Sequence, residues 1–159
     1  VCRHLDALRA AGIEVRHQTG VRDEAVTREA YAAAGYDPAC VSAFIDDMAS
    51  AYAWADLVLC RAGATTVAEL CAAGLPSVLV PFPYAVHDHQ TRNAQALVAE
   101  GAALMLPEAR MEDDGLMEQV TGLLQDTERL RAMAAAASGC ARIRAAELVA
   151  AELETVCAR

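Results

Sequence analysis

The sequence predicts an α/β protein, a parallel sheet with helices on both faces. Short apolar runs of about five residues alternate with helical patterns of about ten residues, which is typical of consecutive βαβ units. The runs at 56–60 and 76–80 are almost wholly apolar, as expected of strands that helices cover on both sides. Ligands of such sheets bind beyond the carboxyl ends of the strands. We therefore expect the function in the loops that follow Phe44, Cys60 and Val80.

The expected elements follow one another without an internal repeat, a low-complexity linker or a clear domain boundary, so 1–159 is expected to form a single domain. The tail of this domain, 112–159, is helical in pattern, with a break at Gly139. Asp46 and Asp47 suit the positive N-terminal end of a helix that begins after them. Strands are expected at 13–17, 40–45, 56–60, 76–80 and 103–105. Other helices are expected through Leu5 and Leu8 up to Gly12 and at 23–34, 66–73 and 90–100.

Composition excludes several classes of function. The chain has 159 residues, is 55% hydrophobic and carries 13 Lys+Arg against 22 Asp+Glu, a formal charge of −9. The apolar fraction is too high for a disordered chain. The acidic balance disfavours nucleic acid, whose phosphates need a basic footprint. The sequence contains no apolar run of about 18 residues, the length that a transmembrane helix needs.

The cysteines and the first residues carry less information. None of the six cysteines lies in a C-x-x-C pair or at metal-finger spacing from a histidine. We expect them to be reduced, buried thiols that pack as small hydrophobic side chains in a cytosolic protein. The chain begins at Val1 with residues that read as the interior of a helix, so a fragment of a longer protein is expected.

The segment 61–69 is the first candidate ligand site. Its small residues let a ligand approach the backbone, and Gly63 is free to adopt a positive φ. The helix that follows offers unpaired N–H groups to a phosphate, Thr65 and Thr66 add hydroxyls, and Glu69 could accept hydrogen bonds from both hydroxyls of a ribose. Residues 66–69 also fit a capping box, in which Thr66 caps the helix and Glu69 reaches back. Spacing alone slightly favours the capping box, and the segment is neither a Walker loop nor a G-x-G-x-x-G fingerprint.

The loop after the second strand offers an aromatic side chain. The ring of Phe44 could stack on a base while the backbone of Ile45 reads the edge of that base. Phe44 could instead be a core residue, which its position alone favours.

The loop after 76–80 ends in a polar cluster that opens a helix. Gln90 and Asn93, one turn apart, could bind sugar hydroxyls, whereas Asp88 or His89 could merely cap the helix. His87, Asp88 and His89 could ligate a metal, but a lone His-x-His pattern lacks a third ligand at a suitable spacing. His89 as a general base lacks an identifiable nucleophile.

Taken together, these loops resemble the MurG family. The resemblance lies in residues 44–48, 51–57, 60–69, 73–76, 80–83 and 89–94 and runs in order from about 17 to 103. The family consists of UDP-N-acetylglucosamine–N-acetylmuramyl-(pentapeptide) pyrophosphoryl-undecaprenol N-acetylglucosamine transferases. It implies a GT-B glycosyltransferase, with two Rossmann-like domains, of which this chain is similar to the C-terminal, donor-binding half.

The resemblance also implies roles for individual residues. Ile45 would contact uracil through its backbone, with Phe44 and Met48 beside the base. Glu69 would hold the ribose, and Gln90 would bind GlcNAc hydroxyls. The complete substrate-binding set that it implies is Phe44, Ile45, Met48, Ala64, Thr65, Thr66, Val67, Ala68, Glu69, His89, Gln90 and Asn93. Ala64, Thr65 and Thr66 would lie along the diphosphate. His87 stands where the family leads us to expect an acidic residue.

The family transfers GlcNAc from UDP-GlcNAc to lipid I with inversion and forms lipid II for peptidoglycan, and hence for the bacterial cell wall, cell shape and division. No metal or other cofactor is implied. The parent would be peripheral on the cytoplasmic face of the plasma membrane. The acceptor domain, the catalytic base, the first strand and a Gly-Gly-Ser-Gln-Gly-Ala-type loop are missing from 1–159, so this piece alone is expected to be inactive. The alternatives are the donor domain of another UDP-sugar GT-B transferase and a non-catalytic nucleotide-sugar-binding module.

Overall fold

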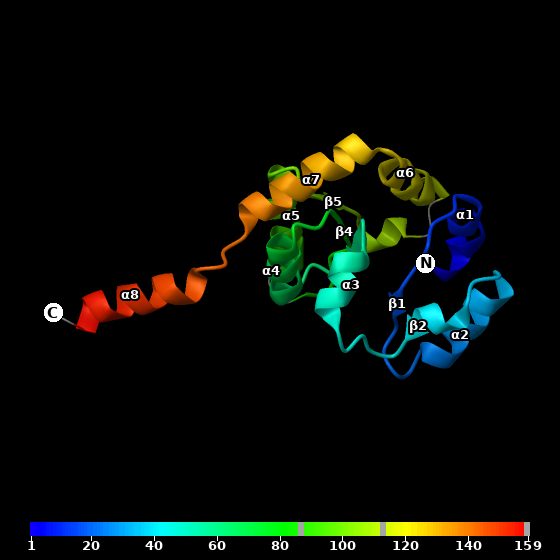
Figure 1. Cartoon of the computed structure of the whole chain (residues 1–159), viewed down its shortest axis with the longest axis horizontal. Coiled ribbons are helices and arrows are strands. Elements are labelled where there is room, and N and C mark those ends of the chain that lie inside the picture. The colour runs from blue at the N-terminus through cyan, green and yellow to red at the C-terminus, as the bar shows by residue number, and fades with distance from the viewer. Residues whose placement is uncertain (86–87, 112–113, 158–159) are drawn as a thin grey trace. The chain divides into compact units, whose positions relative to one another are not determined.

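The structure, a computed structural model, describes residues 1–85, 88–111 and 114–157. It contains two compact units, Val1–Ala55 with Glu112–Asp126 and Asp56–Met111 with Thr127–Arg159. Helices and parallel strands alternate along the chain (Figure 1). The α/β class predicted from the sequence is confirmed. Among the described residues, no helix combines the length and the apolar character that crossing a bilayer requires.

The first unit is built around a pair of parallel strands. β1 (His17–Gln18) pairs with β2 (Val41–Ser42), with His17 opposite Val41. Its core includes Tyr31, which is 0% exposed and whose hydroxyl lies 3.1 Å from Nδ1 of His17. The helices are η1 (Cys2–His4), α1 (Leu5–Ala10), α2 (Glu24–Ala33), η2 (Pro38–Cys40), α3 (Met48–Trp54) and α6 (Asp114–Gln125).

Both strands of this unit are shorter than the sequence predicts. The alternation over 13–17 sets the direction of side chains, but only the last of these residues joins a ladder; the carbonyl of Ile13 instead accepts a hydrogen bond from the Tyr36 hydroxyl at 3.0 Å. The start of the strand expected at 40–45 is displaced by η2, because the Asp37 carboxylate accepts from the Ala39 N–H and turns the chain.

The second unit contains a three-stranded parallel sheet in the order β3-β4-β5. β3 is Val58–Cys60, β4 is Ser77–Leu79 and β5 is Ala103–Met105. All three residues of the central strand β4 are buried, as its apolar sequence predicts. The helices are α4 (Ala64–Ala73), α5 (His89–Ala99), η4 (Glu108–Arg110), α7 (Thr127–Cys140) and α8 (Ala145–Cys157).

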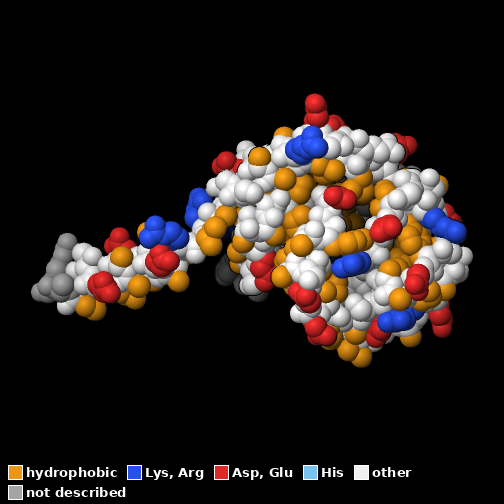
Figure 2. Space-filling view, viewed as in Figure 1, with side chains coloured by type: hydrophobic (Ala, Val, Ile, Leu, Met, Phe, Trp, Pro, Cys, Tyr) orange, Lys and Arg blue, Asp and Glu red, His pale blue; other side chains and the backbone are white. Residues whose placement is uncertain are grey.

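The packing of α4 and the course of the tail complete this unit. α4 ends in Gly74 at φ 65° and packs against α7. The break expected at Gly139 is wrong, because α7 continues through it to Cys140; a single glycine costs a helix only about 1 kcal/mol. α8 has no buried residue, and apolar side chains such as Leu148 and Leu153 are exposed along it (Figure 2).

Candidate functional site

The N-terminus of α4 is open. The helix follows β3 after a short turn, and its N-cap is Gly63, which has no side chain to cap the first amides. The first intrahelical bond runs from the Val67 N–H to the Gly63 carbonyl at 2.9 Å. The N–H groups of Ala64, Thr65 and Thr66 therefore precede the hydrogen-bonded part of the helix. With the positive end of the helix dipole they form an arrangement suited to a phosphate.

The turn does not use the conformational freedom of Gly63, and the capping box is wrong. Gly63 has φ −64°, so the turn does not use the positive φ that only glycine adopts easily. Thr66 is the third residue of α4 and not its N-cap, which excludes the capping box of Thr66 and Glu69. The helix begins two residues earlier than predicted because Gly63, with ψ 147°, already supplies the extended geometry of an N-cap.

The side chains of α4 divide into a buried and an exposed face. Leu70 and Cys71 are buried. Thr65 and Glu69, four residues apart and hence on one face of the helix, are exposed. Ala64 and Ala68 are also exposed, whereas Thr66 and Val67 are half-buried. A carboxylate thus lies one turn beyond the open amides, on the surface of the same helix.

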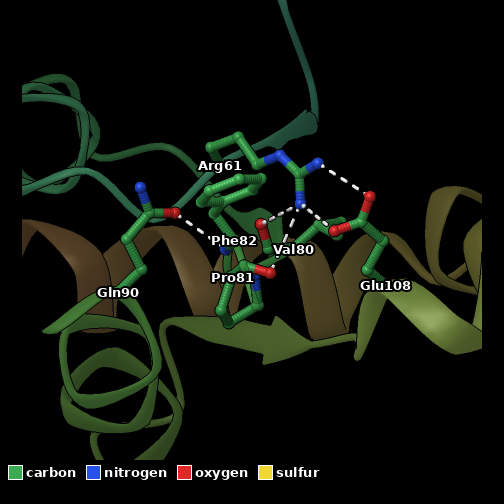
Figure 3. Close-up of polar contacts among 6 residues, drawn as sticks. All are labelled: Arg61, Val80, Pro81, Phe82, Gln90 and Glu108. Atoms are coloured by element: carbon green, nitrogen blue, oxygen red, sulfur yellow. Dashed lines mark hydrogen bonds and ion pairs between the residues drawn. The ribbon is translucent and has the colours of Figure 1, made fainter. Parts of the chain in front are cut away.

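The amide side chains at the start of α5 hold neighbouring loops. Oε1 of Gln90 accepts a hydrogen bond from the Phe82 N–H at 2.9 Å, and Nδ2 of Asn93 donates to the Ala62 carbonyl at 3.0 Å. These bonds use one half of each amide, and Nε2 of Gln90 points away from Phe82 (Figure 3). The pair therefore fixes the loops after β3 and β4.

Asp88 stands at the start of α5 but does not cap the helix through its side chain. Asp88 is the N-cap at φ 54°, but its carboxylate accepts from the Thr91 hydroxyl and not from a backbone amide. The interpretation of Asp88 as a side-chain cap is therefore wrong. His89 is exposed at the first residue of α5, and His87 lies outside the described residues. Among the residues that the structure describes, no group of three or more His, Cys, Asp or Glu could hold a metal ion.

In the first unit, the loop after β2 presents Phe44. Its side chain is 64% exposed, so the interpretation of Phe44 as a core residue is wrong. The N–H of the next residue, Ile45, donates to Oε1 of Gln18 at 2.9 Å. Met48, half-buried, is the first residue of α3.

Asp47 caps α3, as the sequence predicts. Its carboxylate accepts from the Ser50 N–H at 2.9 Å and from the Ser50 hydroxyl at 2.6 Å. The bond from the Ser50 hydroxyl is the largest cause that holds the pKa of Asp47 below its usual value, and the bond from the Ser50 N–H adds to it.

The cysteines are free thiols, as expected, but not all are buried. Cys71 is buried, whereas Cys2 and Cys157 are exposed at the two ends of the chain. Burial raises the pKa of Cys60, at the end of β3, to about 11. This thiol therefore stays protonated near neutral pH and is a poor nucleophile.

The roles of three residues near the candidate site were missed in the sequence. Arg61 forms an ion pair with Glu108 and lies against the ring of Phe82 (Figure 3). The three follow β3, β5 and β4 respectively, by one to three residues. An opposite-charge pair placed after predicted strands is the signal that could have found them.

The fold and the open helix define a class, a Rossmann-like ligand-binding domain whose strand ends suit a phosphorylated ligand. Residues 2–150 match the family model of the glycosyltransferase family 28 C-terminal domain, and the chain belongs to that family.

Relatives with a more specific name resemble the chain over most of its length. It is 54% identical over 149 residues, 94% of this chain and 41% of the relative, to the UDP-N-acetylglucosamine–N-acetylmuramyl-(pentapeptide) pyrophosphoryl-undecaprenol N-acetylglucosamine transferase of Nitratidesulfovibrio vulgaris (strain DP4). The protein of the same name from Xylella fastidiosa (strain M12) is 58% identical over 138 residues, 87% of this chain and 37% of the relative.

A solved structure shows the same likeness. The crystal structure of Acinetobacter baumannii MurG matches with a TM-score of 0.79 and 37% identity, over 96% of this chain and 45% of that one. The resemblance to MurG and the prediction of a Rossmann-like C-terminal half of a GT-B enzyme are thereby confirmed. The chain spans about two-fifths of the length of the curated relatives that it matches.

Proposed function

We propose that this chain is the donor-binding part of a glycosyltransferase that moves GlcNAc from UDP-GlcNAc to lipid I and so forms lipid II for peptidoglycan. One observation carries the proposal: in a chain of the glycosyltransferase family 28 C-terminal domain, α4 begins without a side-chain cap and presents the exposed Glu69 one turn later. A nucleoside diphosphate needs both features, donors for its phosphates and a carboxylate for its ribose.

For the diphosphate we propose the amides of Ala64, Thr65 and Thr66, with the two threonine hydroxyls as further donors. Negative charge grows on the β-phosphate as UDP leaves the anomeric carbon. Donors that are already oriented toward this charge stabilise the transition state without reorganising. Val67 and Ala68 would line the same stretch of helix with backbone and small side chains.

For the ribose and the sugar we propose Glu69 and the start of α5. The Glu69 carboxylate would accept hydrogen bonds from the ribose hydroxyls. Nε2 of Gln90 and Oδ1 of Asn93, the halves of these amides that Phe82 and Ala62 leave unused, would meet GlcNAc hydroxyls, with His89 beside them. For the uracil base we propose Phe44, Ile45 and Met48.

The acceptor and the catalytic base belong to the proposal only through the relatives, which are more than twice as long as this chain. We propose that lipid I and the base are met by a second domain of the full-length protein. The parent would then act at the cytoplasmic face of the bacterial plasma membrane, where it would be a peripheral protein without a metal cofactor.

The test is Glu69→Ala in the full-length protein, with UDP-GlcNAc binding measured by calorimetry. Two hydrogen bonds to a charged group would be lost, each worth about 1.5–3 kcal/mol, so we expect the Kd to rise by at least about a hundredfold. The melting temperature should fall much less than the affinity does, because Glu69 is exposed.

Glu100→Ala is the matched control, since Glu100 is an exposed carboxylate at the end of α5, and it should leave the Kd unchanged. Normal binding by Glu69→Ala would contradict the proposal. A donor panel separates the alternatives: preference for UDP-glucose or a TDP-sugar would indicate another transferase. Binding of UDP-GlcNAc without turnover of lipid I would indicate a non-catalytic module.

A further inference from the structure

One arginine connects the loops after all three strands of the second unit. Arg61 directly follows β3, and its guanidinium forms a bidentate pair with Glu108, Nη1 to Oε2 and Nη2 to Oε1, both at 3.1 Å (Figure 3). Glu108 lies in η4, beyond β5. Between them, Nη1 also donates to the carbonyls of Val80 and Pro81 at 3.4 and 3.3 Å. Because the strand order is β3-β4-β5, the arginine crosses the end of the central strand.

The loop that Arg61 crosses is held from its other side by Gln90. Cζ of Arg61 lies 5.4 Å from the centroid of the Phe82 ring, a cation–π distance. The Phe82 N–H donates to Oε1 of Gln90. Val80 and Pro81 are buried, so the loop is fixed by packing, by the guanidinium and by the Gln90 amide together.

This arrangement decides which way the Gln90 amide faces. A backbone N–H can only donate, so the Gln90 atom that meets Phe82 must be the oxygen. Nε2 is then left as the outward group, and it can only donate. Gln90 would therefore meet a ligand oxygen as a hydrogen-bond donor, for as long as the Phe82 N–H stays in place.

We propose that Arg61, paired with Glu108, is a positioning residue for sugar recognition. It holds residues 80–82, these orient the Gln90 amide, and Gln90 reads a hydroxyl of the donor sugar. This inference rests on the proposed function and adds the residues that set its sugar specificity. The charges support it: the guanidinium already carries a carboxylate partner, and the hydrogen bond from Arg61 keeps the pKa of Glu108 below its usual value.

The competing role is direct contact between Arg61 and a donor phosphate. The two roles differ in the part of the ligand that they affect. A positioning arginine acts on the sugar and leaves UDP binding almost unchanged. A phosphate-binding arginine would act on UDP and on UDP-GlcNAc alike.

The experiment measures the Kd of UDP and of UDP-GlcNAc for Arg61→Ala, Arg61→Lys and Glu108→Ala in the full-length protein. In each variant we expect the ratio of the Kd of UDP to the Kd of UDP-GlcNAc to fall by about tenfold, the equivalent of one hydrogen bond. The Kd of UDP itself should stay within about twofold of the parent. Lysine should fail like alanine because it lacks the planar fork that reaches several acceptors at once. Arg92→Ala removes an exposed cation from α5 and should change neither constant.

A second measurement needs no ligand. Amide hydrogen exchange at Phe82 should become faster by about fivefold or more in Arg61→Ala and Glu108→Ala, because the loop opens more often, and stay unchanged in Arg92→Ala. Unchanged exchange would overturn the positioning role whatever the ligand is. Loss of UDP affinity in Arg61→Ala that lysine restores would overturn it in favour of phosphate contact. Failure of the parent protein to bind UDP-GlcNAc would contradict the proposed function instead, and the exchange result would still decide whether Arg61 holds the loop.

Discussion

The two units fix the loops at their strand ends to different degrees. In the second unit, side chains from other elements hold the loops after β3 and β4. Glu108 binds the Arg61 side chain, Gln90 binds the Phe82 N–H, and Asn93 binds the Ala62 carbonyl. In the first unit, the Ile45 N–H donates to Oε1 of Gln18, which holds the segment after β2, and Phe44 beside it is largely exposed.

The difference matches what each segment is proposed to bind. Phosphate and sugar groups are recognised by hydrogen bonds, which weaken steeply when the geometry is lost. A base that stacks on an aromatic ring tolerates more freedom, because stacking depends mainly on overlap of the two faces. The tightly held loops therefore suit directional contacts, and the exposed ring suits a flat one.

The largest effect that sharpens this comparison is expected at Gly74. It ends α4 at φ 65°, and a Cβ there would overlap the Ser138 hydroxyl of α7. Gly74→Ala should cost about 2 kcal/mol, from the left-handed conformation and the clash together. Its unfolding midpoint in urea should fall accordingly.

Two controls separate these contributions. Gly101, also in the second unit, has φ 74° and open space around it, so Gly101→Ala should cost only about 1 kcal/mol. Gly35 in the first unit meets the mobile end of Arg9, which can move away, and should behave like Gly101. If the three alanine variants are equally stable, rigid packing of α4 on α7 is not the cause.

The next effect concerns the base. Phe44→Ala should raise the Kd for UDP by about tenfold, because base–aromatic stacking is worth about 1–3 kcal/mol. The melting temperature should not move, since the ring is 64% exposed. Tyr84→Ala is the control from the second unit, where the ring is 84% exposed; equal losses of UDP affinity would contradict a specific role for Phe44.

A smaller effect is expected from pH in the first unit. Burial is the larger cause that lowers the pKa of His17, and the charged N-terminus adds to it. Below about pH 7 the unfolded chain, whose histidine pKa is about 6.5, therefore binds more protons than the folded chain. The free energy of unfolding should decrease below about pH 7, by at most about 1.4 kcal/mol per pH unit from this group.

His17→Gln should flatten this slope. The measurement is the urea midpoint of both proteins at pH 7.5, 6.5 and 5.5, with the difference between them plotted against pH. A constant difference would show that His17 does not contribute to the pH dependence.

The smallest effect is expected at Ser77 in the second unit, which like His17 carries a polar side chain in a strand. Ser77 is 0% exposed in the central strand, and its hydroxyl has no hydrogen-bond partner among the described residues, whereas the His17 ring lies beside the Tyr31 hydroxyl. Ser77→Ala removes an unsatisfied buried group and should leave stability unchanged or raise it by about 1 kcal/mol. A clear loss of stability in thermal unfolding would show that the hydroxyl has a partner.

The elements that the sequence predicts best are strands that consist of a short apolar run. β4 lies within the predicted 76–80 and is buried throughout, as its nearly apolar run predicts, and β5 lies at the predicted 103–105. The start of α4 was misplaced because two threonines are good caps in isolation, while the actual N-cap is a glycine that no side chain supplements.

The contacts between loops were beyond a reading of the sequence. Arg61 and Glu108 are 47 positions apart, and they meet because β3, β4 and β5 are neighbours in that order. Gln90 and Asn93 could be recognised as a polar pair one turn apart, but their partners Phe82 and Ala62 depend on how α5 packs. Local pattern therefore found the candidate side chains, and tertiary structure determined which of their atoms remain available.

The most direct test of the central claim is an NMR titration of the 15N-labelled protein with UDP. If the diphosphate binds at the open end of α4, the amide resonances of Ala64, Thr65 and Thr66 should show the largest shifts, and the Gly101 amide beyond α5 should not move. Saturable binding of UDP that leaves the resonances of Ala64, Thr65 and Thr66 unshifted would contradict the account.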